Sequence, residues 1–167
     1  MIRHKVVLKI QRPSLESVFR LDLDVMQQVA AVLQLNPSWS NGRDWVGIAK
    51  ECKRVLIKEL DFRIEAQYAA RFRQQFLDNK EILIPSVVWE LSTRKVLGLD
   101  YLPGTKVSDR EKLLKQGINP SKVAEIGAAS YLEQLVKFGF FHADAHPGNL
   151  AVSKNGELIY YDFGMMG

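Results

Sequence analysis

A chain of 167 residues is long enough for one ordinary domain, and its 47% hydrophobic and 25% charged residues are typical of a globular protein with a sizeable core. The net charge of +4 is small, and acidic residues are interleaved with the basic ones between Lys50 and Arg73, which argues against nucleic-acid binding. The single cysteine excludes an intrachain disulfide, and no apolar run approaches the roughly 20 residues of a membrane-spanning helix.

The first elements are predicted from apolar spacing and from the residues that interrupt it. A β-branched segment ends at Pro13 and predicts a strand. The spacing that follows predicts a helix from Ser14, as its N-cap, to Leu35. From Asp44 to about Leu77 the apolar period is again helical and free of proline, which predicts one long helix with room for a bend.

The period then changes. Residues 81–91 and 95–104 are β-rich segments around a short turn and predict an antiparallel pair. Two helices are predicted over 108–117 and 119–139, with Ser108 and Asn119 as N-caps and with glycine at each end. Asn155-Gly156 lies between two short strand patterns and predicts a hairpin. The order indicates an α+β fold in which a small β-containing lobe meets a helical lobe at Pro103-Gly104, with a site in the cleft.

The segment FHADAHPGNL, followed by YYDFG, carries the chemistry of phosphoryl transfer. That reaction asks the protein for metal ligands, a positioned acceptor and a cation for the phosphates. Asp144 and Asn149 have the five-residue spacing of a kinase catalytic base and metal ligand, and Asp162 of Asp-Phe-Gly fits the second metal ligand. Their hard oxygen atoms suit Mg²⁺.

A competing interpretation takes His142, Asp144 and His146 as ligands of zinc or iron. Alternate positions of an extended segment would share one side, but Pro147-Gly148 favours a turn there. We therefore expect the two histidines to brace the loop by hydrogen bonds.

A phosphate-binding cation is predicted at Lys9, in the middle of the first strand, although an ordinary solvent-facing lysine would have the same pattern. Such a lysine needs a carboxylate to orient it. By composition the candidates are Glu51, Glu59, Asp61 and Glu65. Spacing narrows the choice, because Asp61 and Glu65 share a helical face at i, i+4 while Glu59 points elsewhere, and periodicity goes no further.

Four segments together resemble the UbiB-like, AarF-related family of atypical kinases: LKIQRP at 8–13, KELDFRIEA at 58–66, FFHADAHPGNL and YYDFG. The resemblance extends over practically the whole chain in the same order. It implies a partial protein-kinase-like two-lobe fold, with residues 1–102 in the amino-terminal lobe and 103–167 in the carboxyl-terminal lobe. It also implies that the chain is a piece of a longer protein, because family segments are expected on both sides of it.

The resemblance assigns roles to individual residues. Lys9 contacts phosphate and pairs with Glu65, while Glu59 and Asp61 form the Glu-x-Asp signature near the nucleotide. The remaining assignments are Asp144 as the catalytic aspartate, Asn149 and Asp162 as metal ligands, and Asp100 and Leu102 in the hinge (Leu99–Leu102) that holds adenine through backbone groups.

The implied function is an ATP-binding kinase or ATPase that uses Mg²⁺ and supports the biosynthesis of ubiquinone or another prenylquinone. The implied partners are the nucleotide, lipid or prenylquinone intermediates and a membrane surface, with the full-length protein on the cytoplasmic side of a membrane or otherwise membrane-associated. Two alternatives stay open: a phosphotransferase acting on a small molecule or a protein, and a nucleotide-binding regulator without turnover.

Overall fold

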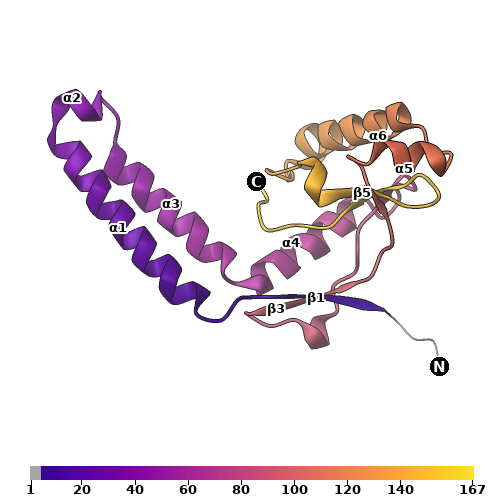
Figure 1. The fold of residues 1–167 in the computed structure, drawn as a ribbon, viewed down its shortest axis with the longest axis horizontal. Coiled ribbons are helices and arrows are strands. Elements are labelled where there is room, and N and C mark those ends of the chain that lie inside the picture. Colours follow the sequence, from indigo (N-terminus) through magenta and orange to yellow (C-terminus); the bar gives the residue numbers. More distant parts are fainter. Residues whose placement is uncertain (1–4) are drawn as a thin grey trace. The chain divides into compact units, whose positions relative to one another are not determined.

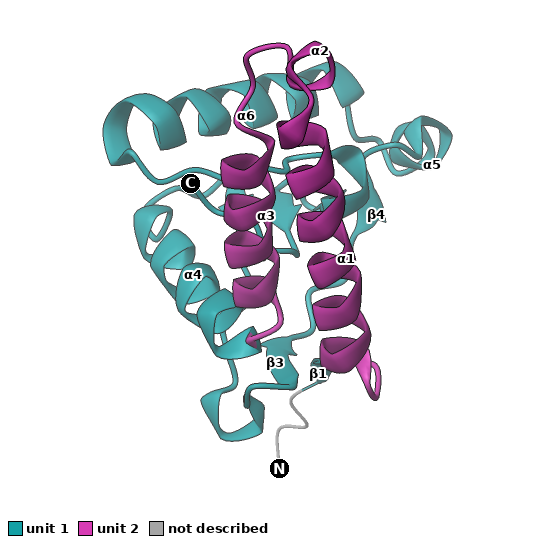
Figure 2. Cartoon of the chain, turned by 90° about the vertical axis from the view of Figure 1, so that its left-hand side faces the viewer, with its two compact units in different colours: residues 1–9, 62–167 teal, residues 10–61 magenta. Residues whose placement is uncertain are grey.

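The computed structural model describes residues 5–167, which form two compact units (Figure 2). Unit 1 contains the residues up to Lys9 and those from Phe62 to Gly167, and unit 2 contains Ile10–Asp61. Lys9 and Phe62 are therefore the residues between which unit 2 is inserted. This division is one of packing, and the lobe boundary predicted between residues 102 and 103 stays a prediction.

Unit 2 is a helical hairpin of α1 (Leu15–Leu35), the short α2 (Pro37–Ser40) and α3 (Trp45–Glu59) (Figure 1). The predicted helix to Leu35 is confirmed, but Ser14 makes no side-chain cap and instead has a left-handed backbone with φ of 60°. The two long helices pack along each other and bury Leu23, Ala30 and Ala49. Gln11 closes the base of the hairpin, because its side-chain amide donates a 2.9 Å hydrogen bond to the Leu60 carbonyl.

One long helix from Asp44 to Leu77 was the wrong prediction, since α3 ends at Glu59 and α4 (Phe62–Gln75) begins a new helix. The cause lies far away in the sequence. The Phe62 N–H donates to the Arg94 carbonyl at 3.0 Å instead of continuing the helical ladder. Periodicity contains no information on such a distant partner.

Unit 1 contains two small sheets. In the first, β1 (Val6–Ile10) pairs with β3 (Val96–Asp100). The second has the order β2 (Ile82–Leu83), β6 (Leu158–Tyr160), β5 (Leu150–Val152) and β4 (Thr105–Lys106). The predicted hairpin at Asn155-Gly156 is confirmed, because β5 and β6 are antiparallel with Ala151 opposite Ile159 and Gly156 has a φ of 92°.

The antiparallel pair predicted for residues 81–91 and 95–104 is confirmed only around one bridge, Val87 to Leu99. Elsewhere the two segments separate: Ile82 pairs in parallel with Leu158, and η1 (Trp89–Leu91) interrupts the first segment. Pro85, which has no N–H to donate, lies fully buried between these two parts.

Besides α4, two helices of unit 1 cover the second sheet. They are α5 (Arg110–Lys115) and α6 (Pro120–Glu133), the latter continuing into the π-helix η2 (Gln134–Phe138). Asn119 caps α6 as predicted, whereas α5 is capped by Asp109 rather than by Ser108. Gly117 and Gly139 have the positive φ angles, 74° and 59°, that helix ends favour.

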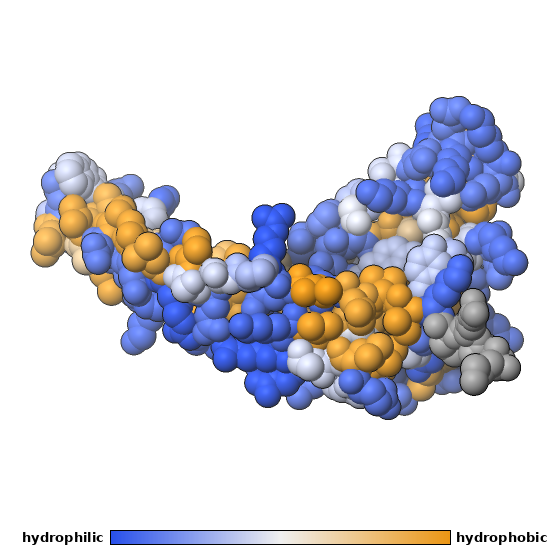
Figure 3. All heavy atoms as spheres, turned by 60° about the horizontal axis from the view of Figure 1, so that its bottom comes forward, coloured by the Kyte–Doolittle hydropathy of each residue, from blue (hydrophilic) through white to orange (hydrophobic). Residues whose placement is uncertain are grey.

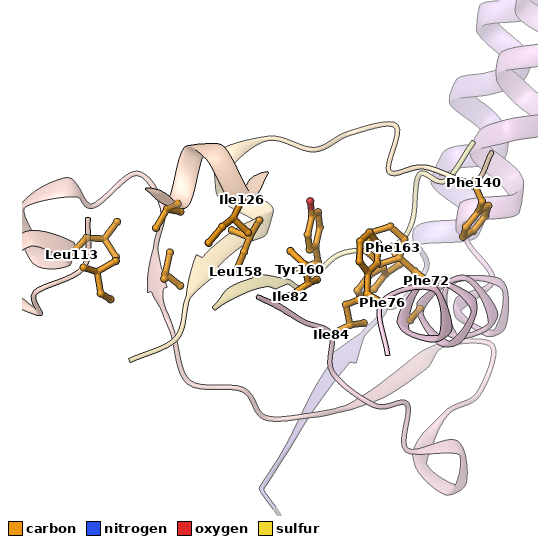
Figure 4. Close-up of a cluster of buried hydrophobic side chains, with 14 residues drawn as sticks. Phe72, Phe76, Ile82, Ile84, Leu113, Ile126, Phe140, Leu158, Tyr160 and Phe163 are labelled. Atoms are coloured by element: carbon orange, nitrogen blue, oxygen red, sulfur yellow. The ribbon is translucent and has the colours of Figure 1, made fainter. Parts of the chain in front are cut away.

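An aromatic core lies between α4 and the second sheet (Figure 4). Phe72 is fully buried and its ring lies 5.1 Å from that of Tyr160 and 5.7 Å from that of Phe163. This core anchors the segment that contains Asp162, because Tyr160 lies two residues before that aspartate and Phe163 directly follows it. Within residues 5–167, no helix has the length and apolar character needed to cross a bilayer.

Candidate active site

Lys9 and Glu65 form an ion pair within unit 1. The Lys9 Nζ lies 2.8 Å and 3.0 Å from the two carboxylate oxygens of Glu65. The lysine side chain is 42% exposed and the glutamate 6%, so the carboxylate holds the lysine from beneath while the ammonium faces solvent. Glu65 lies in the first turn of α4, where the helix dipole stabilises a carboxylate.

Asp162 lies at the same place. Its Oδ2 is 3.4 Å from the Lys9 Nζ, and its Oδ1 accepts a 3.0 Å hydrogen bond from the Gly164 N–H. The next residue, Phe163, is fully buried against Phe72, which fixes the backbone of Asp162 (Figure 4). The structure thus brings together the cation and one of the two expected metal ligands.

The charges of this group follow from burial and pairing. Burial acts to lower the pKa of Lys9, but the attraction of Glu65 and Asp162 outweighs it and the pKa is raised. Burial raises the pKa of Glu65, with Lys9 opposing it. Burial also acts to raise the pKa of Asp162, yet the Gly164 N–H and Lys9 hold it below its usual range. A cationic lysine therefore faces an ionised Asp162 at neutral pH.

His142 connects the catalytic loop to Asp162. The residue is only 1% exposed, and burial is the main reason why the pKa of its imidazole is lowered. The Nδ1 accepts a 3.1 Å hydrogen bond from the Asp144 N–H, so the proton of the neutral ring is on Nε2. That Nε2–H donates to the Asp162 carbonyl at 2.6 Å. The imidazole thereby joins the backbones of both aspartates.

Asp144 and Asn149 lie on the exposed part of the loop. The Asn149 Nδ2 lies 3.4 Å from the Asp144 carbonyl, and Asn149 ends the 3₁₀ turn η3 (Pro147–Asn149). His146 caps this turn, because its Nδ1 accepts from the Gly148 N–H at 3.0 Å. The side chains of Asp144 and His146 are each about half exposed, so the Asp144 carboxylate is open to an acceptor.

The expectation that the two histidines brace the loop is confirmed by these hydrogen bonds. The zinc or iron interpretation loses support, because both ring nitrogens of His142 are already engaged within the protein. A transition metal would need one of these lone pairs.

The residues predicted to form the hinge lie on or just after β3. Asp100 ends that strand, with its N–H bonded to the Ser86 carbonyl at 2.9 Å. The Leu102 carbonyl accepts a 2.7 Å hydrogen bond from the Tyr161 hydroxyl, which ties this segment to the residue before Asp162. Glu59 and Asp61 belong to unit 2, and their place near the nucleotide stays a prediction.

Gln134 is a residue of this region that the sequence patterns did not single out. It is fully buried, and its Oε1 accepts the His142 N–H at 2.9 Å. A signal was present: Val123, Ile126, Ser130 and Gln134 follow the spacing of one buried helix face, on which a glutamine is unusual.

Comparison with known proteins decides the family. A family profile described as ABC1 atypical kinase-like domain matches residues 3–167. The chain belongs to this family. Among its relatives, an uncharacterized protein of Synechocystis, sll1770, is 46% identical over 163 residues that cover 97% of this chain and 28% of that protein. Activity of BC1 complex kinase 7, a chloroplastic protein of Arabidopsis thaliana, is 45% identical over 98% of this chain and 23% of its own length.

A solved structure supports the ABC1 kinase-like fold. Rv3197 of Mycobacterium tuberculosis, solved in complex with erythromycin, matches 98% of this chain and 40% of its own with a TM-score of 0.78 and 27% identity. The predicted α+β, kinase-like fold is thereby confirmed. The ABC1-family chain spans about a quarter of the length of the curated relatives named above.

The residues present fit a magnesium–nucleotide complex by the chemistry of their donors. Asn149 and Asp162 supply amide and carboxylate oxygens, which Mg²⁺ prefers, and Mg²⁺ commonly takes its other ligands from water and substrate phosphates. No cluster of three or more His, Cys, Asp or Glu side chains suited to a metal occurs among residues 5–167.

Proposed function

We propose that this ABC1-family chain carries the nucleotide site of an ATP-dependent enzyme, a kinase or ATPase that uses Mg²⁺. The observation that supports it is the group of Lys9, Glu65 and Asp162, in which a solvent-facing ammonium lies 3.4 Å from a candidate metal ligand. Binding of a metal–polyphosphate requires a fixed cation for the phosphates and an ionised carboxylate for the metal, and this group supplies both.

Each residue then has a separate task. Glu65 orients Lys9 toward the phosphates through two hydrogen bonds, and the third ammonium proton faces the Asp162 Oδ2 at 3.4 Å, a long contact that a phosphate oxygen can share. Asp162 and Asn149 hold Mg²⁺, which neutralises charge on the phosphoryl oxygens when bound. The exposed Asp144 carboxylate accepts the proton of the attacking hydroxyl or water.

We further propose that the acceptor belongs to prenylquinone metabolism, or that water is the acceptor in a process supporting it. This part rests on the family resemblance, with no contact of this chain as its basis. A membrane-associated setting is proposed on the same ground.

The test is a thermal shift with Mg²⁺ and ATP or ADP, on the full-length protein and on this chain. Nucleotide at 100 times its dissociation constant should add about 2.7 kcal/mol to the free energy of unfolding. We expect Asp162→Asn to abolish the shift, while the matched change at the exposed Asp78, Asp78→Asn, leaves it intact. No shift in a folded wild-type protein would refute the proposal.

Product analysis with labelled ATP then separates the reactions. Transfer of label to water, to a lipid or to Ser/Thr of a protein identifies the acceptor class. Binding without any turnover would favour the regulator over the enzyme.

A further inference from the structure

A row of buried polar side chains lies beneath the catalytic loop of unit 1. It consists of Ser130, Gln134, Tyr160 and His142, which are exposed by 2%, 0%, 1% and 1%. Buried polar groups are costly unless they are hydrogen-bonded, and a fully connected row rigidifies its surroundings. None of these four residues offers a group to solvent, so their effect on the reaction must pass through other residues.

Donor and acceptor can be assigned for every hydrogen bond of this row. The Ser130 hydroxyl donates to the Gly127 carbonyl at 2.9 Å, which uses its only proton. The Ser130 oxygen therefore accepts from the Tyr160 hydroxyl, 2.7 Å away. The Tyr160 oxygen in turn accepts from the Gln134 Nε2 at 3.3 Å.

Gln134 turns this row toward the catalytic loop. Its amide nitrogen faces Tyr160, so its Oε1 is left for the His142 backbone N–H, 2.9 Å away. A flipped amide would place N–H groups against the His142 N–H, which excludes that orientation. From His142 the ring continues to the Asp144 N–H and to the Asp162 carbonyl. One glutamine thus connects α6 with the backbones of both aspartates.

The helix itself changes shape at this residue. Gln134 is the first residue of the π-helix η2, which ends at Phe138 and is followed by Gly139 with its left-handed φ of 59°. Single π turns inside α-helices are rare and are frequent at functional sites. Here the π turn lies between Gln134 and the loop to which Gln134 is hydrogen-bonded. That loop begins at Phe141, three residues after the end of η2.

We propose that Gln134 is a positioning residue for phosphoryl transfer, which holds the catalytic-loop aspartate and Asp162 in register through the backbone and ring of His142. The inference rests on the proposed function of the same site. Gln134 contacts no reacting atom, and its effect falls on turnover and metal binding rather than on the Lys9–Glu65 pair, which shares no hydrogen bond with the row.

The test compares three substitutions along the row in the full-length protein: Gln134→Met, Tyr160→Phe and Ser130→Ala. We expect kcat to fall about 10- to 100-fold for Gln134→Met, the range seen when residues behind a metal site are changed. The loss should shrink with distance from the loop, becoming several-fold for Tyr160→Phe and small for Ser130→Ala. The KM for ATP should change little, while the Mg²⁺ concentration for half-maximal rate rises.

A purely structural role predicts a different pattern, in which activity follows the melting temperature whichever residue is changed. That outcome, or an unchanged kcat and Mg²⁺ requirement in Gln134→Met, would overturn the inference. Gln134→Glu is the conservative variant, because it keeps an acceptor oxygen for the His142 N–H. We expect it to recover most of the turnover, and it also serves if Gln134→Met does not fold.

A second readout needs no activity. In protein labelled with [¹⁵N]histidine, the ring of His142, assigned through His142→Gln, should show the Nε2–H tautomer in the wild type and averaging of tautomers in Gln134→Met. If the wild-type protein neither binds nor hydrolyses Mg²⁺–ATP, the proposed function fails. The comparison of the His142 tautomers alone then decides whether Gln134 positions the His142 ring. An unchanged tautomer in the variant would then reject it.

Discussion

The two units of the chain differ in how much of a core they have. Unit 1 has a buried aromatic core, with Phe72, Tyr160 and Phe163 at 0–1% exposure. Unit 2 is a two-helix hairpin in which α1 leaves an apolar row exposed, formed by Val18, Leu21, Val25, Val29, Val32 and Leu35 at 51–84%. Orange side chains of this hairpin are seen at the left of Figure 3.

The contrast shows where the chemistry can be held. Every residue of the Lys9–Glu65–Asp162 group belongs to the unit with the aromatic core, although 52 residues of unit 2, Ile10–Asp61, separate Lys9 from Phe62 in sequence. The insertion is compatible with this because Gln11 and Leu60 join its two ends at 2.9 Å. A hairpin closed at its base interrupts the chain without separating the residues on either side.

The largest effect on stability is expected in the core of unit 1. Phe72→Ala removes a fully buried ring with aromatic neighbours at 5.1–5.7 Å and should lower the free energy of unfolding by about 3–5 kcal/mol. Leu23→Ala in unit 2 is the comparison, and should cost about 2 kcal/mol, at the low end for such a change. Denaturant unfolding measures both, and an equal cost would contradict the difference between the units.

The next effect concerns the ion pair. Lys9→Met removes the cation and leaves the Glu65 carboxylate, 6% exposed, without its partner. We expect kcat/KM for ATP to fall at least 100-fold, about 2.7 kcal/mol of transition-state stabilisation. Lys5→Met, at the residue before β1, is the control and should have little effect on the kinetics. A Lys9→Met enzyme with near-normal kinetics would exclude the phosphate-binding role.

Sequence patterns predicted the part of this site that is local. The spacing of Asp144, Asn149 and Asp162 and the hairpin at Asn155-Gly156 depend on neighbours in the chain, so they were visible without a structure. The choice of Glu65 among four carboxylates was not, because periodicity assumed a continuous helix. The Phe62–Arg94 hydrogen bond that ends it is a tertiary event. The family resemblance selected Glu65 where periodicity did not.

Gln134 shows the same limit from another side. Glutamine is a common helix residue, and only its burial and its bond to the His142 N–H distinguish it. In the π-helix that follows, the Phe138 ring packs 5.6 Å from that of Phe76, a residue far away in the sequence. Neither can be inferred from the spacing of apolar residues alone.

The pH dependence of stability offers a third comparison. His142 has its pKa lowered by burial, whereas an unfolded histidine titrates near 6.5. Below pH 6.5 the unfolded state therefore binds more protons than the folded state, and stability falls as the pH drops toward the folded pKa. The slope from this one group is at most about 1.4 kcal/mol per pH unit. Urea unfolding between pH 7.5 and 5 measures it, and His142→Asn should flatten the curve; an unchanged slope would remove His142 as its cause.

A smaller effect is expected at the base of the hairpin. Gln11→Ala deletes the hydrogen bond to the Leu60 carbonyl and should cost about 1 kcal/mol. If the closed base is what keeps the insertion from disturbing unit 1, hydrogen exchange should rise in residues 10–61 while nucleotide-induced stabilisation is retained. Faster exchange in α4 would instead show that the hydrogen bond between Gln11 and Leu60 stabilises unit 1 as well as unit 2.

The smallest effect is expected on the exposed row of α1. Val25 is 51% exposed, so Val25→Ser removes little buried apolar area and should change the free energy of unfolding by less than about 0.5 kcal/mol. The matched change in unit 1 is Val152→Ser at a residue 1% exposed, where loss of packing and burial of a hydroxyl both act and the cost should be several times larger. Unfolding of the chain compares them directly. A large loss at Val25 would mean that this face is covered by another part of the protein in solution, and the contrast between the units would then describe this segment alone.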